Sequence, residues 1–464
     1  MSEKIKLEHN YLGKTLTHAG LVGVNTGPVV NKNGDGTNNT DETLTNEYRK
    51  DYAELGVNSV RTHDFYSRFD LDEVYDIENG TFDWESTDEA FRNIILSGAY
   101  VYLRLGFSFV SKSGKFTFMN NTGTQNTMCN VALAIVERYK NAEFIAQRMR
   151  STFANKIKYV EIWNEPDHSN FWPEDENCIE DFVDLFYEIL TSIRSKHPEL
   201  KIGGPGFTQE AYSDSKGKKI IDAMIDKYEA NKNKRALDFL SWHCYSYDPD
   251  TYQKLLEKFS TKVAHKLGTT IHHITEWNRP VGEEEKDDVP TITQFEISAL
   301  SACWMWMNRK GIHEAHFFRG IDGKKGIINE RNHTDQPIAY AFKLWSKFAR
   351  STKGGYKLYE ISGEKSDTTI SWNVNENDRF FGIGAYGKNC YVMLLTNVSK
   401  KEDEIKGDDY KYKISTPKSS DDYTIHDITV YKITQGGVSQ TDSSLDDKWV
   451  LLRRNAVHLI VINL

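Results

Sequence analysis

Residues 159–172 read YVEIWNEPDHSNFW, and this stretch raises the question of what chemistry sits at its end. An apolar run with the character of a strand stops at Asn164 and Glu165, and the proline that follows cannot donate a hydrogen bond to a neighbouring strand. A second stretch, HHITEWN at 272–278, is also an apolar run that ends near a glutamate, Glu276. Two strands that each end at a carboxylate indicate a site if the fold brings them together.

Short apolar runs recur along the chain, separated by segments with apolar residues at helical spacing. Eight such runs stand at 21–25, 57–63, 100–107, 159–165, 201–207, 238–245, 271–278 and 313–320. Alternating strands and helices predict parallel strands joined by helical crossovers, and closing eight of them gives a (β/α)8 or TIM barrel. An open doubly wound sheet is the alternative, but the first run is not followed by the glycine spacing of a phosphate-binding loop.

Several segments carry helix signals. Residues 46–56 end on a glycine, where a helix C-cap belongs, and residues 87–99 repeat this pattern with Thr87 as the expected N-cap. Residues 179–198 show apolar residues at helical spacing and a terminal proline. The tryptophans of 302–310 are expected to lie on a further helix and to pack in the core.

The pattern changes after residues 337–351, where helical spacing gives way to alternation of apolar and polar residues with turn signals between the runs. This change predicts an all-β domain, most simply a β-sandwich. We therefore expect an α/β chain with a (β/α)8 catalytic barrel at 19–348 and a C-terminal β-sandwich at 349–464. Residues 1–18 are expected to add a strand to the sandwich.

Composition limits the partners of this 464-residue chain. Its net charge is −9 and its basic residues form no stripe, so nucleic acid is not an expected partner. The five cysteines are scattered, and neither metal-ligand spacing nor a disulfide framework is evident. No apolar run has the length of a signal peptide or a membrane span. The chain is expected to be cytoplasmic. A secreted form from which the signal peptide has been removed stays open as an alternative. A homo-oligomer also stays open.

Polar residues concentrate at the ends of the predicted strands, which is where the site of a (β/α)8 barrel lies. Strands four and seven lie across the barrel mouth from each other, so Glu165 and Glu276 are expected to face one another. The other residues expected at these ends, as candidates for binding substrate, are Arg61, His63, Asn164, His243, Tyr245, Asn278 and Arg319.

Two carboxylates that face each other suggest hydrolysis of a glycosidic bond. One must be protonated to donate to the departing oxygen, and the other must be ionised to attack the anomeric carbon. Arg61 and Tyr245 are candidates to hold Glu276 ionised, and Asn164 is a candidate to bond a sugar hydroxyl. A carboxyl separation of roughly 5 Å would indicate retention of configuration, and roughly 6.5–9.5 Å would indicate inversion.

The sequence resembles clan A of the glycoside hydrolases, and within it most closely family 39, the β-xylosidases and α-L-iduronidases. The resemblance rests on WNEPDHSNFW at 163–172 and TEWN at 275–278, together with VRTHDF at 60–65 and GIINERNHTDQPIAYAFKLW at 326–345. The β domain that follows these motifs agrees with the family as well, so the resemblance covers nearly the whole chain in order.

The family resemblance implies a role for each motif. Glu165 is the general acid/base and Glu276 the nucleophile of a retaining mechanism, without a cofactor. Residues that match positions lining the sugar site are Arg61, His63, Asn164 and Tyr245, joined by Phe171 and Trp172 after the acid/base motif and by Trp277 beside the nucleophile.

The expected activity is that of a retaining glycosidase acting on terminal sugars of a glycoside or oligosaccharide, with a β-xyloside favoured. VRTHD and WNEPDH lean toward the iduronidases, whereas TEWN leans toward the xylosidases, so an α-L-iduronidase-like enzyme and an endo-acting one stay open. Further alternatives are a non-catalytic carbohydrate-binding barrel and a metal-dependent hydrolase. A metal is not expected, because the adjacent His272 and His273 point to opposite faces of a strand.

Overall fold

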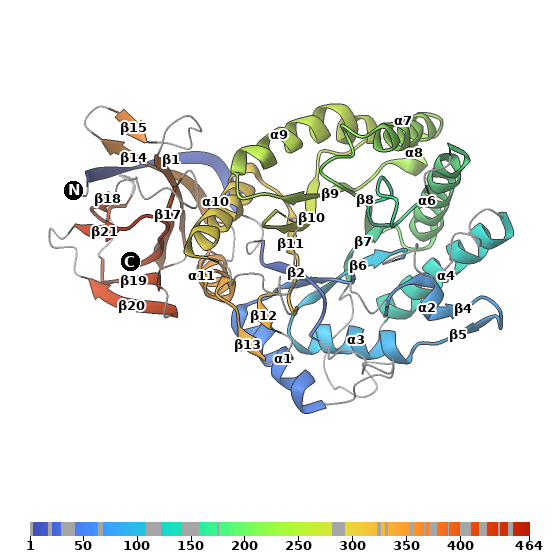
Figure 1. Cartoon of the computed structure of the whole chain (residues 1–464), viewed down its shortest axis with the longest axis horizontal. Coiled ribbons are helices and arrows are strands. Elements are labelled where there is room, and N and C mark those ends of the chain that lie inside the picture. Colours follow the sequence, from blue (N-terminus) through green and yellow to red (C-terminus); the bar gives the residue numbers. More distant parts are fainter. Residues whose placement is uncertain are drawn as a thin grey trace.

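The computed structural model of the chain shows two parts, a barrel of strands surrounded by helices and a largely antiparallel sheet beside it (Figure 1). The residues that the structure describes are 3–16, 21–28, 42–63, 68–107, 122–141, 157–173, 176–280, 293–322, 326–329, 333–352, 356–365, 368–370, 378–387, 389–399, 410–416, 425–434, 437–443 and 449–464.

Eight parallel strands close into a barrel in the order β10-β11-β2-β3-β6-β7-β8-β9. Their bounds are β2 Gly23–Asn25, β3 Ser59–Arg61, β6 Tyr100–Leu105, β7 Ile157–Ile162, β8 Lys201–Phe207, β9 Phe239–Tyr245, β10 His272–Asn278 and β11 Glu314–Phe317. Each of the eight predicted runs overlaps one of these strands, and β7 begins two residues before its run, so the barrel prediction is confirmed. The strands are buried almost throughout, as expected for a parallel sheet covered on both faces.

Helices surround the barrel between consecutive strands. The longer ones are α1 Glu42–Leu55, α3 Glu85–Leu96, α4 Thr122–Asn141, α6 Glu176–Lys196, α7 Ser215–Glu229, α9 Pro249–Phe259, α10 Gln294–Lys310 and α11 Ile338–Ser351. Shorter elements are α2 Leu71–Val74, α8 Lys232–Arg235, η2 Ser260–Ala264, η3 His265–Leu267 and the hairpins β4 Tyr75–Asp76 with β5 Thr81–Phe82 and β12 Ile328–Asn329 with β13 Thr334–Asp335. In the described part of the chain, no helix has the length and apolarity to cross a membrane.

The predicted N-cap of α3 was wrong. The helix begins at Glu85, two residues before Thr87, and the N-cap position is held by Trp84 without a side-chain cap bond. Thr87 is buried inside the helix, and its hydroxyl donates to the backbone oxygen of Arg68 at 2.5 Å. A distant backbone acceptor therefore satisfies the hydroxyl that sequence reasoning assigned to the helix start.

Helix α10 begins with a capping box, in which Thr293 and Glu296 bond each other's backbone N–H, and ends at Gly311 with φ 74°. Trp304 and Trp306 on this helix are both buried, as predicted. Trp304 stacks on Trp345 of α11 with ring centroids 5.6 Å apart. The two helices thus form a packed pair at the edge of the barrel.

The remaining strands form one ten-stranded sheet with the path β20-β19-β22-β17-β16-β14-β1-β18-β21, and β15 pairs with β14. Their bounds are β1 Glu3–Leu16, β14 Tyr356–Lys365, β15 Thr368–Ile370, β16 Asp378–Tyr386, β17 Cys390–Ser399, β18 Tyr410–Tyr412, β19 Asp427–Thr434, β20 Gly437–Ser443, β21 Val450–Leu452 and β22 Val457–Asn463. The N-terminal strand β1 runs antiparallel to β14 and parallel to β18, so the two ends of the chain share this sheet.

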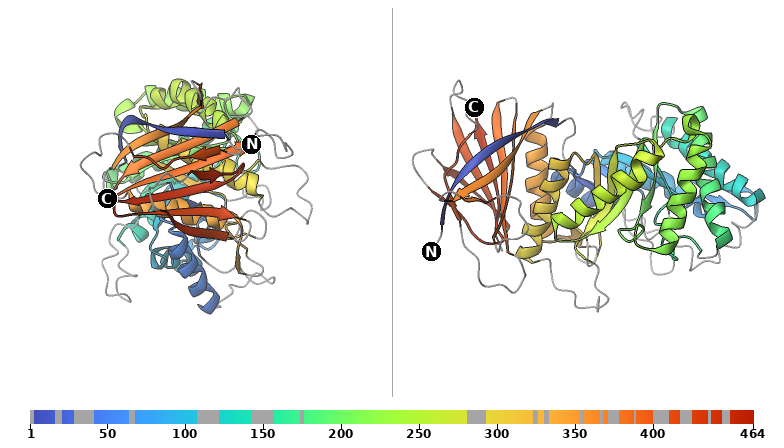
Figure 2. Two further views of the ribbon diagram at one scale, coloured as in Figure 1. Left: turned by 90° about the vertical axis from the view of Figure 1, so that its left-hand side faces the viewer. Right: turned by 90° about the horizontal axis from the view of Figure 1, so that it is seen from above.

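The sheet folds over to make two layers. The hydroxyl of Tyr412 on β18 lies 3.0 Å from Nδ1 of His458 on β22, although four other strands separate β18 from β22 along the sheet. Between the two layers lies an apolar core that is separate from the core of the barrel. The layer that contains β16, β17 and β22 packs one face in this inner core and the other face against α10 and α11. These two helices lie between the sheet and the barrel (Figure 2). Strand β17 shows both contacts, because Met393 lies in the inner core and Leu394 in the core shared with the barrel.

Candidate active site

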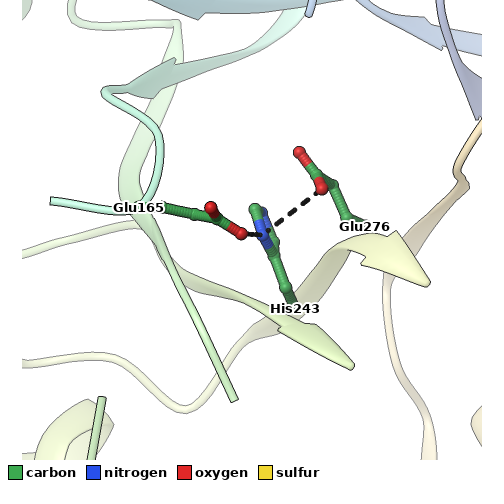
Figure 3. A group of neighbouring side chains, drawn as sticks. All are labelled: Glu165, His243 and Glu276. Atoms are coloured by element: carbon green, nitrogen blue, oxygen red, sulfur yellow. Dashed lines mark hydrogen bonds and ion pairs between the residues drawn. The ribbon is translucent and has the colours of Figure 1, made fainter. Parts of the chain in front are cut away.

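Glu165 and Glu276 meet at the carboxyl ends of the barrel strands, although β8 and β9 separate their strands in the barrel. Nδ1 of His243 on β9 lies 2.6 Å from Oε1 of Glu165 and 3.6 Å from Oε2 of Glu276. Figure 3 shows the three side chains pointing toward one another, and one ligating atom of each lies within 4.8 Å of those of the other two. Distant stretches of sequence thus form one cluster.

Glu165 is positioned by an irregular turn after β7. Trp163 and Glu165 have φ angles of 79° and 44°, in the left-handed region that residues with a Cβ atom rarely adopt. Hydrogen bonds hold both residues: Trp163 N donates to Leu105 O at 2.8 Å, and Glu165 N donates to Gly206 O at 3.0 Å. Backbone strain of this kind costs on the order of 1–3 kcal/mol per residue and persists only where the surrounding structure enforces it.

Glu276 owes its direction to a β-bulge. Along β10, Ile274 pairs with Trp242 of β9 and Glu276 pairs with His243, which leaves Thr275 as an extra residue. Without the bulge, regular alternation from the inward-facing His273 would turn Thr275 toward the barrel interior and Glu276 away from it. The backbone oxygen of Thr275 accepts a hydrogen bond from Nδ2 of Asn25 at 2.9 Å.

The same bulge also sets the direction of Trp277, and the prediction that Trp277 binds substrate was wrong. The residue after Glu276 faces outward, and the Trp277 ring is fully buried against Phe317 and Trp345, with centroids 5.1 and 5.7 Å away. Trp172 is likewise buried; its indole donates to Cys178 O at 2.6 Å and packs on Trp163. Neither tryptophan reaches the Glu165–Glu276 cluster, because both fill the core around the barrel.

Strong hydrogen-bond donors surround Glu276. Arg61 Nη1 donates to Oε1 at 2.8 Å, and the hydroxyl of Tyr245 donates to Oε2 at 2.6 Å. His63 Nε2 lies 3.6 Å from Oε1. The two predicted partners of Glu276 are therefore both in contact with it, and an ionised carboxylate is the acceptor that a guanidinium and a phenol fit best.

Arg61 is a buried support and not a surface for substrate. Its side chain has 0% exposure, whereas that of Glu165 has 15%. Besides Glu276, its guanidinium donates to Glu161 Oε2 at 2.6 Å, Asn25 Oδ1 at 3.0 Å and Asn164 Oδ1 at 2.7 Å. Its predicted contact with substrate is therefore corrected: these bonds occupy the guanidinium from within the barrel, and Arg61 orients Glu276 instead.

Glu161 and Asn25 were missed by sequence reasoning. Glu161 could have been noticed as a charged residue in the middle of an apolar strand. Asn25 could have been noticed as a polar residue at the end of the first apolar run. Gly206 was missed as well: its φ is 69°, and a Cβ atom there would lie 3.2 Å from Nε2 of His243 and 3.4 Å from Nη2 of Arg61. A glycine at this position leaves room for both side chains.

The surroundings of Glu165 favour its protonated form. Burial, followed by the nearby negative charge of Asp167, raises the pKa of Glu165 to about 8, although His168 and Arg61 act in the opposite direction. A carboxyl group with this pKa holds a proton at neutral pH and can serve as a general acid.

The surroundings of the two histidines of the site favour their neutral forms. Burial lowers the pKa of His243, and burial together with Arg104 and Arg61 lowers the pKa of His63 well below its usual range. Nδ1 of His63 and Nδ2 of Asn164 are buried and have no hydrogen-bond partner among the described residues. The contact of His63 and Asn164 with substrate stays a prediction.

The remaining predicted substrate-binding residues differ in their contacts with the rest of the protein. The Phe171 ring lies 6.2 Å from that of His63. Asn278 donates through Nδ2 to the backbone oxygen of Phe318 and accepts from Arg279 N at 2.7 Å, so its amide is engaged by the protein. Arg319 Nη2 donates to Asp322 Oδ2 at 2.8 Å.

The donor set could in principle hold a metal ion. Among the described residues, Glu165, His243 and Glu276 form a group with ligating atoms close enough to share one. The guanidinium of Arg61, 2.8 Å from Glu276, already places a positive charge beside this group and opposes a second cation. The chemistry of the donors thus suits two cooperating carboxyl groups better than a metal centre.

Comparison with known proteins places this site in context. Residues 133–294, which include both glutamates, match the model of the glycosyl hydrolases family 39. No curated protein matches the chain. The resemblance to family 39 and clan A predicted from the sequence motifs is confirmed, and it supports a glycoside hydrolase.

Solved structures share the fold over the whole chain. A glucosidase from Croceicoccus marinus has a TM-score of 0.68 and 15% identity, with 99% of each chain covered. A family 39 enzyme from Xanthomonas axonopodis pv. citri has a TM-score of 0.65 and 14% identity, with 100% of this chain and 97% of that chain covered. A family 39 β-xylosidase from Caulobacter crescentus has a TM-score of 0.63 and 14% identity, with 99% of each covered.

Proposed function

We propose that this chain, which resembles glycoside hydrolase family 39, is a retaining glycosidase in which Glu165 is the general acid/base and Glu276 the nucleophile. The observation that carries the proposal is the meeting of two carboxyl groups with opposite surroundings: Glu165 lies near the negative Asp167, and Glu276 accepts from the positive Arg61.

The proposed reaction has two balanced steps. In the first, an oxygen of Glu276 bonds to the anomeric carbon, the bond from that carbon to the leaving oxygen breaks, and the proton of Glu165 moves to the leaving oxygen. In the second, the Glu165 carboxylate takes a proton from water, the water oxygen bonds to the anomeric carbon, and the ester to Glu276 breaks.

The separation of the carboxyl groups supports retention. Retaining glycosidases hold their two carboxyl groups roughly 5–5.5 Å apart, whereas inverting ones need roughly 6.5–9.5 Å to admit a water molecule. One oxygen of Glu165 and one of Glu276 lie within 4.8 Å of each other, and this close approach supports the shorter class.

The neighbouring side chains have roles that follow from their contacts. Tyr245 and Arg61 hold the attacking oxygens of Glu276 in place, and the neutral His243 contacts the carboxyl group of Glu165. The unpartnered amide nitrogen of Asn164, directly before Glu165, is suited to donate to a sugar hydroxyl next to the reacting carbon.

A neutral sugar is the favoured substrate, with a β-xyloside first. A uronic acid would need a cation for its carboxylate, and the two arginines expected at the strand ends are engaged, Arg61 inside the barrel and Arg319 with Asp322. The names of the similar structures, a glucosidase and a β-xylosidase, agree with this choice.

A panel of aryl glycosides followed by NMR tests the proposal. We expect turnover of a β-xyloside or another neutral glycoside, with a first-released sugar that keeps the anomeric configuration of the substrate. Release of the opposite anomer would contradict the retaining mechanism, and binding without turnover of any glycoside would favour a carbohydrate-binding barrel. Loss of turnover on treatment with a chelator, restored by metal, would favour a metal-dependent hydrolase.

A further inference from the structure

We propose that Asn25 is a positioning residue that holds the carboxylate of Glu276 in place to attack the anomeric carbon. The inference rests on the proposed function, in which Glu276 is the nucleophile. Asn25 is fully buried, so it acts on Glu276 through Arg61 and through the backbone, and not through the substrate.

The Asn25 amide joins two strands that are not neighbours in the barrel. Asn25 ends β2, which lies between β3 and β11. On one side its Oδ1 accepts from Nη1 of Arg61 on β3 at 3.0 Å. On the other side its Nδ2 reaches past β11 and donates to the backbone oxygen of Thr275 on β10 at 2.9 Å. One side chain therefore connects the strand that carries Glu276 with the strand that carries its cation.

These contacts close a ring of hydrogen bonds around Glu276. The Thr275 carbonyl belongs to the peptide bond that leads into Glu276. The Arg61 Nη1 that donates to Asn25 also donates to Oε1 of Glu276 at 2.8 Å. A guanidinium Nη carries two hydrogens, one for each acceptor. The same amide thus holds the backbone of Glu276 directly and its carboxylate through Arg61.

The Thr275 carbonyl needs this donor because it lies at the β-bulge. The register of β10 shifts at this point against both β9 and β11, so the regular ladder is interrupted on both sides of the strand. A buried backbone carbonyl without a partner is costly. The Asn25 amide supplies a donor and so stabilises the bulge that turns Glu276 toward the barrel interior.

An amide suits both contacts, and its orientation is fixed. Thr275 O can only accept and Arg61 Nη1 can only donate, so the oxygen and the nitrogen of the Asn25 amide cannot exchange places. The second N–H also has an acceptor, the backbone oxygen of His316 at 3.3 Å. Aspartate has the same shape but cannot donate to the Thr275 carbonyl, and leucine has neither polar group.

The ring can be opened without releasing Arg61. Its Nε donates to Glu161 at 2.6 Å and its Nη2 donates to Asn164 at 2.7 Å, and neither contact involves Asn25. Loss of the Asn25 amide should therefore leave the guanidinium inside the barrel and deprive only Nη1 and the Thr275 carbonyl of a partner. The expected result is a misdirected nucleophile in a site that otherwise keeps its structure.

The test is Asn25→Leu, which roughly keeps the size of the side chain and removes both polar groups. We expect kcat on the aryl glycoside that the wild type hydrolyses fastest to fall by about 10- to 100-fold, because misplacing a reacting group by about 1 Å costs up to about that much. The inhibition constant of the monosaccharide released from this substrate should stay unchanged. A lower kcat with unchanged sugar binding indicates a change in positioning.

Two further variants accompany this test. Asn308→Leu is the matched control, because Nδ2 of the buried Asn308 also donates to a backbone oxygen, that of Trp304 on α10, at 2.9 Å. This variant loses the same kind of bond and should keep the wild-type kcat. Asn25→Asp keeps an acceptor for Arg61 and loses the donor to Thr275. It should also lower kcat, and it replaces Asn25→Leu if that variant does not fold.

A crystal structure of the folded Asn25 variant without ligand separates this inference from the proposed function. We expect an altered bulge at Thr275, or Arg61 Nη1 and Glu276 Oε1 too far apart for a hydrogen bond. An unaltered bulge and contact, or a wild-type kcat in the folded variant, would overturn the role of Asn25, as would an equal loss of kcat in Asn308→Leu. Absence of glycosidase turnover in the wild type would instead defeat the proposed function, whatever the crystal structure shows.

Discussion

Glu165 and Glu276 are residues of the same type in two different surroundings, with one oxygen of each lying within 4.8 Å of the other. Glu165 follows its strand in a left-handed turn, contacts His243, and has its pKa raised by burial and by Asp167. Glu276 stands inside its strand and accepts from a cation and a phenol. The comparison shows that neighbours, and not residue type, separate a proton donor from a nucleophile.

Removing the nucleophile is expected to have the largest effect. Glu276→Gln keeps the size of the side chain but cannot form the sugar ester, so kcat should fall by about four orders of magnitude or more. Initial rates on the best aryl glycoside measure the loss, and circular dichroism checks the fold. A Glu276→Gly variant supplied with azide should yield a glycosyl azide of inverted configuration; near-normal turnover of Glu276→Gln would refute the assignment.

Removing the proton donor should have a smaller effect that depends on the leaving group. General acid catalysis is worth about 10²–10⁴-fold, so Glu165→Gln should lose about that much with an alkyl glycoside. A leaving group that departs without protonation, such as dinitrophenol, should restore much of the first step. The comparison of the two substrates in one variant is the measurement, and an equal loss with both would contradict a general-acid role.

Tyr245→Phe removes the hydrogen bond from the Tyr245 hydroxyl to Glu276 and keeps both carboxyl groups. Loss of a hydrogen bond to a charged acceptor costs about 1.5–3 kcal/mol, which corresponds to about a 10- to 160-fold fall in kcat/KM. Tyr252→Phe is a matched control, because its hydroxyl bonds the backbone oxygen of Cys244 at 3.2 Å and not Glu276. A similar loss of activity in both variants would point to a change in the fold.

The pH dependence of kcat/KM should show the smallest effect, and it reports most directly on the protonation of Glu165. Glu165 must be protonated for the first step, and its raised pKa of about 8 predicts that kcat/KM falls as the pH rises through about 8. In Glu165→Gln this basic limb should disappear from the residual activity on an activated substrate. A limb that remains at the same pH in that variant would assign it to another group.

Much of the molecule could be predicted from local patterns. The eight apolar runs all became barrel strands, and alternation after 337–351 indicated the antiparallel sheet, because periodicity depends on nearby residues alone. The order of strands in a parallel barrel then put the ends of β7 and β10 near one another. Both glutamates could be selected on that basis.

Predictions that depended on side-chain direction were less secure. Trp277 was assigned to the substrate, but the bulge at Thr275 turns it outward while turning Glu276 in. Arg61 was expected to touch sugar, but Glu161 and Asn25 hold it inside the barrel. Thr87 was expected to cap a helix, but it lies inside α3 and its hydroxyl donates to the backbone oxygen of Arg68.

The sequence by itself determined the alternation of strands and helices, the antiparallel domain and the two strand ends that carry glutamates, because these follow from the spacing of apolar residues. Only the tertiary structure decided which way each residue of β10 points and which charges stand beside Glu165 and Glu276. The reason is physical: strand register and electrostatic neighbours arise between segments that lie far apart in the chain.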